Sequence, residues 1–396
     1  MNSSRPKKSR WIPILQVIVG LGLLALVAYF VPWRDRLIWS DDSGKRSFDG
    51  AIEGEWKSEA IDFAFDARPA DLPAPLAGAT RDTEGAAKVH VVRDEHVDWR
   101  PGLLRVFREL DTSGLLKAFA CLCCGLTFTV LRWWRLLLAA GCRATPFQSL
   151  RLTLLGMFFN IVVPGLTGGD VIKAVLVARE NPGKKTEAVI SVFVDRIIGI
   201  VVLAAIAAVV IVATGENAFA AIRTPVIAAA TAGVLGAFVY VNGTLRRWIG
   251  LDRLLAKLPG GALFQKIDQA VLVYSRHPWE MLGAFLLSVG NHLSVVLGVL
   301  ALGRAFGDTV ATLDYFVAVP VANIATALPL SPGGWGFGEA VFGTLWEMLG
   351  GSASLGIATS VTFRLLLLSF GLVGGLFLLV PGGRLDLDQV ERESKS

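Results

Sequence analysis

The sequence predicts an all-α polytopic membrane protein, and three observations carry that prediction. Hydrophobic residues make up 53% of the 396 residues, charged residues only 18%, and the mean hydropathy is +0.57. Long apolar runs recur, each sufficient for a helix to cross roughly 30 Å of hydrocarbon. Short segments rich in Lys and Arg flank these runs, as at the cytoplasmic ends of membrane helices. We expect about six full spans plus two re-entrant helical hairpins, with a small extracytoplasmic β insertion after the first span.

The composition also excludes several function classes. The formal charge of +5 does not indicate nucleic-acid binding, because the basic residues are concentrated beside apolar runs, where they report topology. Cys121, Cys123 and Cys124 lie inside an apolar run and are interpreted as small buried hydrophobic residues, not as a disulfide framework or zinc site. His96, between two acidic residues, is interpreted as part of a solvated strand end in preference to a metal site. We expect no metal, no cofactor and no nucleic acid.

The first part of the chain predicts an anchor followed by an external module. Residues 1–33 begin with the basic stretch "MNSSRPKKSR" and continue as an apolar run, which predicts a cytoplasmic N-terminus and a first span. A cleaved signal peptide is the alternative, but the run is longer than usual and has no small-residue cleavage site. Residues 34–112 alternate apolar and polar side chains between Gly-rich turns, which predicts a small extracytoplasmic β module. The protein is expected in the cell (inner or plasma) membrane.

Residues 113–382 are expected to form the main transmembrane domain, followed by a cytoplasmic tail at residues 383–396. Apolar runs predict full spans at residues 113–140, 188–214, 226–242, 279–304 and 352–380. The basic residues that follow or end the first of these runs, beside two Trp, are interpreted as marking its cytoplasmic end: Arg132, Arg135, Arg143 and Arg151.

Two further apolar regions, residues 147–179 and 315–349, are interrupted by Pro and Gly. The first is flanked by basic residues on both sides, which predicts a hairpin that enters and leaves from the cytoplasm. The second repeats the pattern from the opposite face. "NIVVPGLTGGD" in one region and "NIATALPLSPGGWGFGEA" in the other are similar enough to suggest an inverted repeat, as in secondary transporters.

The first interruption is a candidate anion site. Backbone that breaks its helix at membrane depth is tolerated where it lines a wet cavity or is buried in protein. A helix beginning near Gly169 would point its free N–H groups at a phosphate, with Lys173 about one turn along. The alternative is that Asp170 only caps this helix while Lys173 extends to the membrane surface.

Ionisable residues inside later spans extend the candidate site. Asp195, Arg196, Glu339 and Arg364 are costly in hydrocarbon unless they are paired or hydrated. We expect one interior polar cavity that contains these residues together with the charged pair of the first interruption. The alternative is a set of structural ion pairs that lock helices together. Asn291 and His292 either line the cavity or bridge helices.

The motifs "NIVVPGLTGGDVIKA", "AVISVFVDRIIG" and "SPGGWGFGEA" resemble those of the transmembrane region of lysylphosphatidylglycerol synthases and their stand-alone, flippase-like relatives. The resemblance covers about residues 113–382. The positions that match its motifs are Asn160, Pro164, Gly168, Gly169, Asp170, Asp195, Arg196, Gly199, Pro332, Gly333, Gly334, Gly336 and Glu339. Lys173 departs by standing where the family usually has Arg, which removes bidentate phosphate binding. Trp335, Phe337 and Gly338 depart from the second glycine motif.

The resemblance implies a lipid flippase or transporter that moves an anionic or aminoacylated phospholipid, or a related isoprenoid- or glycerol-based lipid, between leaflets. Because the chain stops soon after its last predicted span, we expect the aminoacyl-transferase chemistry of full synthases to be absent and the protein not to be an enzyme. The predicted substrate site comprises Asn160, Pro164, Gly168, Gly169, Asp170, Lys173, Asp195, Arg196, Pro332, Gly333, Gly334, Gly336, Glu339 and Arg364. Two alternatives remain: a scaffold that binds an envelope partner through residues 34–112, and an intramembrane lipid-headgroup enzyme using Asp170, Asp195 or Glu339 as acid or base.

Overall fold

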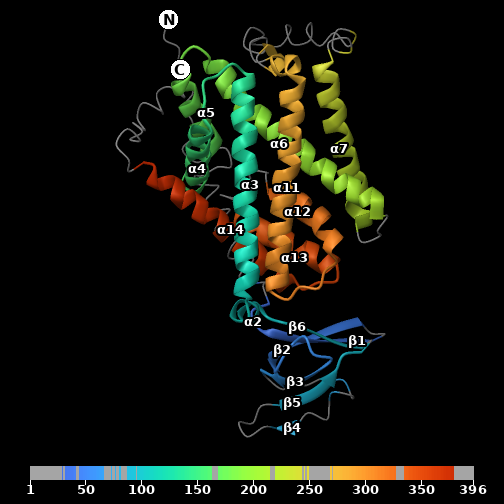
Figure 1. The fold of residues 1–396 in the computed structure, drawn as a ribbon. Helices are drawn as coiled ribbons and strands as arrows, with labels where there is room; N and C mark the ends of the chain where they lie inside the picture. Colours follow the sequence, from blue (N-terminus) through green and yellow to red (C-terminus); the bar gives the residue numbers. More distant parts are fainter. Residues whose placement is uncertain are drawn as a thin grey trace, which may run out of the picture.

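The computed structural model has a helical body with a small antiparallel sheet at one end (Figure 1). It describes residues 29, 32–41, 44–66, 73, 76, 80–81, 87–94, 96–162, 168–214, 219–242, 245, 248, 268–269, 271–326 and 334–378. The predicted tail, residues 383–396, lies outside the described residues, as does nearly all of the predicted first span.

The six-stranded sheet confirms a small β module near the start of the chain. Its strands are β1 (Asp35–Asp41), β2 (Gly44–Glu53), β3 (Ala60–Phe65), β4 (Thr80–Arg81), β5 (Ala87–Val92) and β6 (Val97–Arg100), in the order β4-β5-β3-β2-β1-β6. Alternate side chains, among them Leu37, Phe63, Val89 and Trp99, are buried on one face. The period of two in the sequence therefore reflects one buried face and one polar face.

A buried carboxylate fastens the sheet to the helical body. Asp35 accepts hydrogen bonds from the backbone N–H of Gly102 at 2.7 Å and from Nε of Arg105 at 2.8 Å, in helix α2 (Leu103–Arg108). The hydroxyl of Ser354, near the start of helix α14 (Ala353–Leu376), donates to the carbonyl of Pro101 at 2.5 Å. The sheet is thus held against the same end of the body at two places.

Two long helices, α3 (Thr112–Ala139) and α11 (Pro278–Ala305), pack side by side through the centre of the body (Figure 1). Small residues allow this close approach, since a Cβ at Gly114 would lie 2.5 Å from the Cβ of Ala305. Asp111 caps α3 by accepting from the backbone N–H groups of Ser113 and Gly114. The hydrogen bond from the Ser113 hydroxyl holds the pKa of Asp111 below its usual value.

Two pairs of shorter helices lie at opposite ends of the body. Helices α4 (Pro146–Val162) and α5 (Gly168–Glu180) lie far from the sheet, whereas α12 (Thr312–Thr326) and α13 (Phe337–Met348) lie close to it (Figure 1). Helix α6 (Lys185–Thr214) packs against α5 and α12, and α14 packs against α13 and α4. Each of α6 and α14 therefore contacts one helix from each short pair, an arrangement that fits the repeat suggested by the sequence. The two Pro-containing turns lie outside the described residues.

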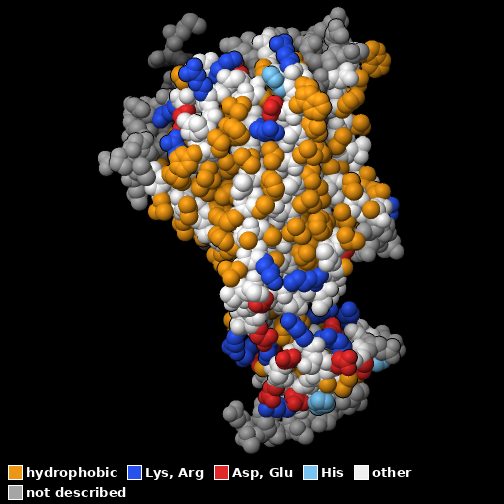
Figure 2. Space-filling model, viewed as in Figure 1, with side chains coloured by type: hydrophobic (Ala, Val, Ile, Leu, Met, Phe, Trp, Pro, Cys, Tyr) orange, Lys and Arg blue, Asp and Glu red, His pale blue; other side chains and the backbone are white. Residues whose placement is uncertain are grey.

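Four described helical segments are long and apolar enough to cross a membrane: Thr112–Ala139, Lys185–Ala213, Pro278–Ala305 and Ala353–Leu376. The span expected at residues 226–242 falls in α7 (Ala220–Val241), where the apolar segment found, Ile222–Gly236, is shorter. Figure 2 shows hydrophobic side chains around the middle of the helical body, with Lys and Arg above this band and at its boundary with the sheet. The chain is therefore a multi-pass membrane protein.

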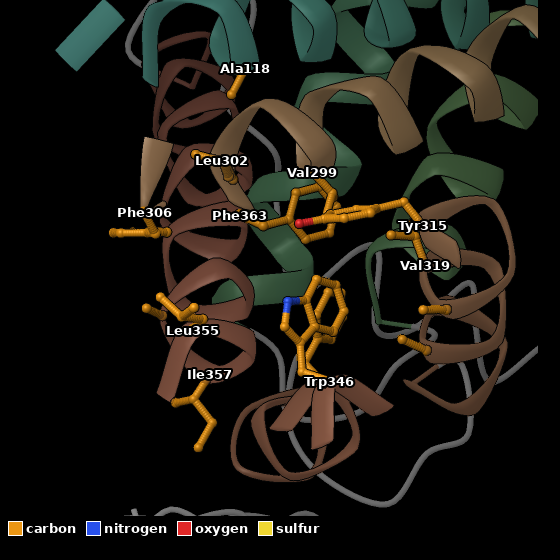
Figure 3. Packing of buried hydrophobic residues seen from close by; sticks show 14 of the residues in the cluster. Ala118, Val299, Leu302, Phe306, Tyr315, Val319, Trp346, Leu355, Ile357 and Phe363 are labelled. Atoms are coloured by element: carbon orange, nitrogen blue, oxygen red, sulfur yellow. The ribbon is translucent and has the colours of Figure 1, made fainter. Parts of the chain in front are cut away.

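The core nearest the sheet contains a second buried carboxylate. Tyr315 and Trp346 meet edge to face, with ring centroids 5.2 Å apart, among apolar residues such as Val299 and Phe363 (Figure 3). The indole N–H of Trp346 donates to Asp308 at 3.0 Å, and the Tyr315 hydroxyl donates to the same oxygen. These bonds join α12 and α13 to the turn that follows α11.

Candidate functional site

A polar cavity of about 350 Å³ lies inside the helical body, bounded by α3, α4, α5, α6, α11 and α14. Its walls are otherwise built from apolar membrane helices, so its polar side chains stand apart from their surroundings. The charged and polar residues that line it include Thr129, Arg132, Asn160, Asp170, Lys173, Asp195, Arg196, Asn291 and His292. The cavity therefore contains four of the six charged residues that the sequence assigned to one site.

A buried ion pair forms the inner wall of the cavity. Nε of Arg132, on α3, lies 2.7 Å from Oδ1 of Asp195, on α6, and the same guanidinium donates to the hydroxyl of Ser288 on α11 at 2.8 Å. Both charged side chains are buried. Since hydrocarbon strongly disfavours an isolated charge, each residue of this pair makes the other tolerable. The pair also joins three long helices.

Arg132 is the main residue that sequence reasoning missed. Its position beside Arg135 and two Trp predicted an interfacial cluster, but Arg132 lies seven residues before Ala139, the last residue of α3. At 1.5 Å per residue, this distance places Arg132 about 10 Å inside the helix end. That depth, together with an acidic residue in another span, is the signal that could have revealed it.

A second ion pair lies at the mouth of the cavity. Arg196, on α6, pairs with Asp170, in the first turn of α5. The side chain of Arg196 is 43% exposed and shares a face of α6 with the exposed residues Phe193, Ile197 and Ile200. We call this part of the wall the mouth of the cavity, because the partly exposed Arg196 lies where the lining meets the apolar outer face of α6. Asp170 therefore has a charged partner in addition to any role as a cap.

Lys173 lies between the two pairs and does not extend to the membrane surface. The residue is only 6% exposed, and its Nζ lies 3.6 Å from the centre of the Trp133 ring. The Trp133 indole is itself held by a hydrogen bond to the hydroxyl of Ser191 at 3.1 Å. Among the described residues no carboxylate forms an ion pair with Lys173. The alternative in which this side chain snorkels is therefore wrong.

The backbones of α4 and α5 come into contact at two glycines. The side-chain oxygen of Asn160 accepts a hydrogen bond from the N–H of Gly169 at 2.9 Å, which satisfies one free donor at the start of α5. A Cβ at Gly169 would lie 2.0 Å from the carbonyl oxygen of Gly156. The predicted site residues Gly168 and Asn160 therefore stand at the ends of this helix pair, whereas Pro164 lies outside the described residues.

Asn291 and His292, from the middle of α11, complete the opposite wall. The hydroxyl of Thr129 donates to the side-chain oxygen of Asn291 at 3.1 Å, and Nε2 of His292 lies 2.9 Å from the carbonyl oxygen of Gly199. Both residues line the cavity and also bridge helices. The two interpretations that the sequence left open therefore both apply.

Glu339 and Arg364 form a separate buried pair. Nε of Arg364, on α14, lies 2.9 Å from Oε1 of Glu339, which is 1% exposed, and the other carboxylate oxygen accepts from the N–H of Gly336 at 2.5 Å. Gly334 and Gly336 adopt positive φ angles of 73° and 79°, which favour glycine. Pro332 and Gly333 of the same motif lie outside the described residues.

The expectation of one cavity containing all six charged residues needs correction. The described lining of the cavity includes neither Glu339 nor Arg364. Leu367 and Phe370, one to two turns beyond Arg364 on α14, line the cavity instead, because the two helix pairs approach from opposite ends of the body. Four of the six residues thus lie in the described lining of this cavity, and the other two form the buried pair that joins α13 to α14.

Metal-binding groups are not gathered among the described residues, where no cluster of three or more His, Cys, Asp or Glu side chains has metal-site geometry. His96 instead stacks on Trp39 in the sheet, with ring centroids 5.8 Å apart. The four cysteines are free thiols. The described lining of the cavity offers charged and hydrogen-bonding side chains.

Comparison with known families agrees with the motifs found in the sequence. The sequence model of the lysylphosphatidylglycerol synthase transmembrane region matches residues 96–375, which is more than half of the chain and spans all the helices that bound the cavity. No curated protein matches the chain. The protein belongs to the family of the lysylphosphatidylglycerol synthase transmembrane region.

Proposed function

We propose that this protein moves a phospholipid between the two leaflets of a cell membrane, with the headgroup passing through the cavity between α5 and α6. The observation that carries the proposal is a charged cavity inside an apolar helical body, with its mouth on an outer face of α6. Family membership supports a function in membrane-lipid chemistry. A polar headgroup cannot enter hydrocarbon cheaply, so a hydrated, charged path lowers the barrier to its transfer.

The size and position of the cavity suit a headgroup. A volume of about 350 Å³ is near the lower end of the range for small-molecule sites. It is too small for a lipid with its acyl chains, but a mouth flanked by Phe193 and Ile197 lets these chains remain in the membrane while the headgroup enters. The Asp170–Arg196 pair at the mouth would be the first polar contact, and the buried Arg132–Asp195 pair the last.

The two helix pairs supply a route to alternating access. We propose that α4–α5 and α12–α13 are re-entrant hairpins that enter from opposite faces, as in transporters built from inverted repeats. The basic residues Arg143, Arg151, Lys184 and Lys185 lie around the ends of α3, α5 and α6 that are far from the sheet, which supports a cytoplasmic location for that end. The sheet would then lie outside the cytoplasm, and both termini inside.

Asp195→Asn is expected to slow lipid transfer by about tenfold or more, a factor that corresponds to about 1.4 kcal/mol. The change keeps the size of the side chain but removes the charge that balances Arg132, so the inner wall becomes more positive and less ordered. The measurement is dithionite quenching of fluorescent phosphatidylglycerol and its lysyl derivative in proteoliposomes. Glu280→Gln is the matched control, because its pair with Arg135 is exposed, with 3.7 Å between the charged atoms. Equal rates for the native protein and empty vesicles would refute the proposal.

A further inference from the structure

We propose that the cavity selects lipids whose headgroup carries one net negative charge, a phosphodiester bearing a neutral hydroxylated group, and that Lys173 sets this preference. The inference rests on the proposed function and deepens it by assigning a substrate class to the cavity. It follows from the charges on the cavity wall, from the place of Lys173 among them, and from the neutral character of the opposite wall.

The cavity wall carries one positive charge more than its internal pairs require. Asp195 is neutralised by Arg132, and Asp170 by Arg196. Lys173 remains as a third cation, and it forms no ion pair with a described carboxylate. Its Nζ lies over the face of the Trp133 ring, where the ring quadrupole attracts a cation. A single anion is therefore the guest that balances the cavity.

The position of Lys173 supplies a matching geometry. The residue lies in the second turn of α5, on the cavity side, and the helix begins at Gly168 with its N-terminal end at the same cavity. The dipole of this helix and the buried ammonium therefore act on the same volume, and both favour negative charge. Lys173 is more than nine-tenths buried, so its charge is little weakened by water.

The opposite wall indicates what the rest of the headgroup contains. Thr129, Asn291 and His292 provide neutral hydrogen-bonding groups and no carboxylate. An added amino group, as in a zwitterionic or aminoacylated lipid, would meet three cations and two carboxylates that already have partners. Hydroxyl groups, in contrast, find both donors and acceptors on this wall. The cavity thus fits a lipid of the phosphatidylglycerol type better than its aminoacylated derivative.

The test compares four lipids that carry the same fluorophore on the acyl chain and differ only in the headgroup: phosphatidylglycerol, phosphatidylethanolamine, phosphatidylcholine and lysyl-phosphatidylglycerol. The native protein is expected to move phosphatidylglycerol about tenfold faster than the other three, in the dithionite assay. Lys173→Gln is expected to reduce the phosphatidylglycerol rate to that of the other three lipids. Lys173→Arg should retain the preference, and Lys185→Gln, which changes an exposed lysine at the start of α6, should behave as the native protein.

The headgroup preference of the native protein tests the inference even when a variant fails to fold. Equal rates for the four lipids would overturn it while leaving lipid transfer in place. A Lys173→Gln variant that slows all four lipids by the same factor would also overturn it, since Lys173 would then support the structure without distinguishing headgroups by their charge. Rates no higher than those of empty vesicles for every lipid would refute the proposed function itself, and the inference with it.

Discussion

Arg364→Met is expected to destabilise the helical body by about 3–5 kcal/mol, because it leaves Glu339 as a buried carboxylate without its cation. Met fills a similar volume and tolerates an apolar setting, so the loss of the charge is the main change. Thermal unfolding in detergent would measure the effect. The single substitution should also weaken the contact between α13 and α14, which this pair joins.

Two further variants show whether the loss of stability comes from leaving one buried charge without its partner. Arg135→Met breaks the exposed pair with Glu280, where a loss of about 0–1 kcal/mol is expected. The double variant Glu339→Gln/Arg364→Met removes both charges and should recover much of the stability, because the two sites are coupled. If Arg364→Met were no less stable than Arg135→Met, the buried pair would not hold these helices together.

Gly169→Ala is expected to separate α4 from α5 and to abolish lipid transfer. The new Cβ would lie 2.0 Å from the carbonyl oxygen of Gly156 and 2.5 Å from the side-chain oxygen of Asn160. Backbone cannot yield as a flexible side chain does, so the helices must move apart, at a cost of about 1–3 kcal/mol or more. The start of α5 would then lose its hydrogen bond to Asn160, and the cavity its shape.

Gly183→Ala is the matched control for this change. Gly183 lies in the turn between α5 and α6, where no neighbouring atom lies within 4 Å of the position that a Cβ would take. Its replacement should leave unfolding temperature and transfer rate close to the native values. A Gly169→Ala protein as stable and as active as Gly183→Ala would show that the close contact of α4 and α5 is dispensable.

The sequence predicted the architecture where local pattern decides the structure. Period-two alternation in residues 34–112 corresponds to the sheet, and uninterrupted apolar runs correspond to α3, α6, α11 and α14. The residues 226–242 corresponded less well, because the helix in that region begins earlier, at Ala220, and its apolar segment is shorter. Hydropathy reports whether a segment is apolar, but packing sets where a helix begins and ends.

Partners of the charged residues could not be read from the sequence. Asp195 and Arg364 each lie four residues after a serine that opens a similar motif, in "SVFVDR" and "SVTFR". Their partners come from different places: Arg132 belongs to α3, whereas Glu339 belongs to the short helix α13. Residues that look equivalent in two halves therefore take unlike partners, because ion pairing depends on neighbours distant in sequence.

The structure brings together four of the charged residues that the sequence assigned to one cavity, whereas their role in substrate binding stays a prediction. Asp170, Lys173, Asp195 and Arg196 all line the cavity, since the need to hydrate or pair intramembrane charges draws them to one place. The burial of Lys173 over Trp133 was not foreseen, because a lysine near a helix start in a membrane protein often extends to the surface.

The most direct test of a headgroup path through the cavity is to fill the cavity while leaving its charged residues unchanged. Thr129 lines the cavity from α3, and Thr127, two residues earlier, is exposed on the outside of the same helix. The transfer rate of fluorescent phosphatidylglycerol would be measured for Thr129→Trp and Thr127→Trp proteins that elute and unfold as the native protein does. We expect Thr129→Trp to lose transfer and Thr127→Trp to keep it. Transfer at the native rate by both variants would contradict a headgroup path through this cavity.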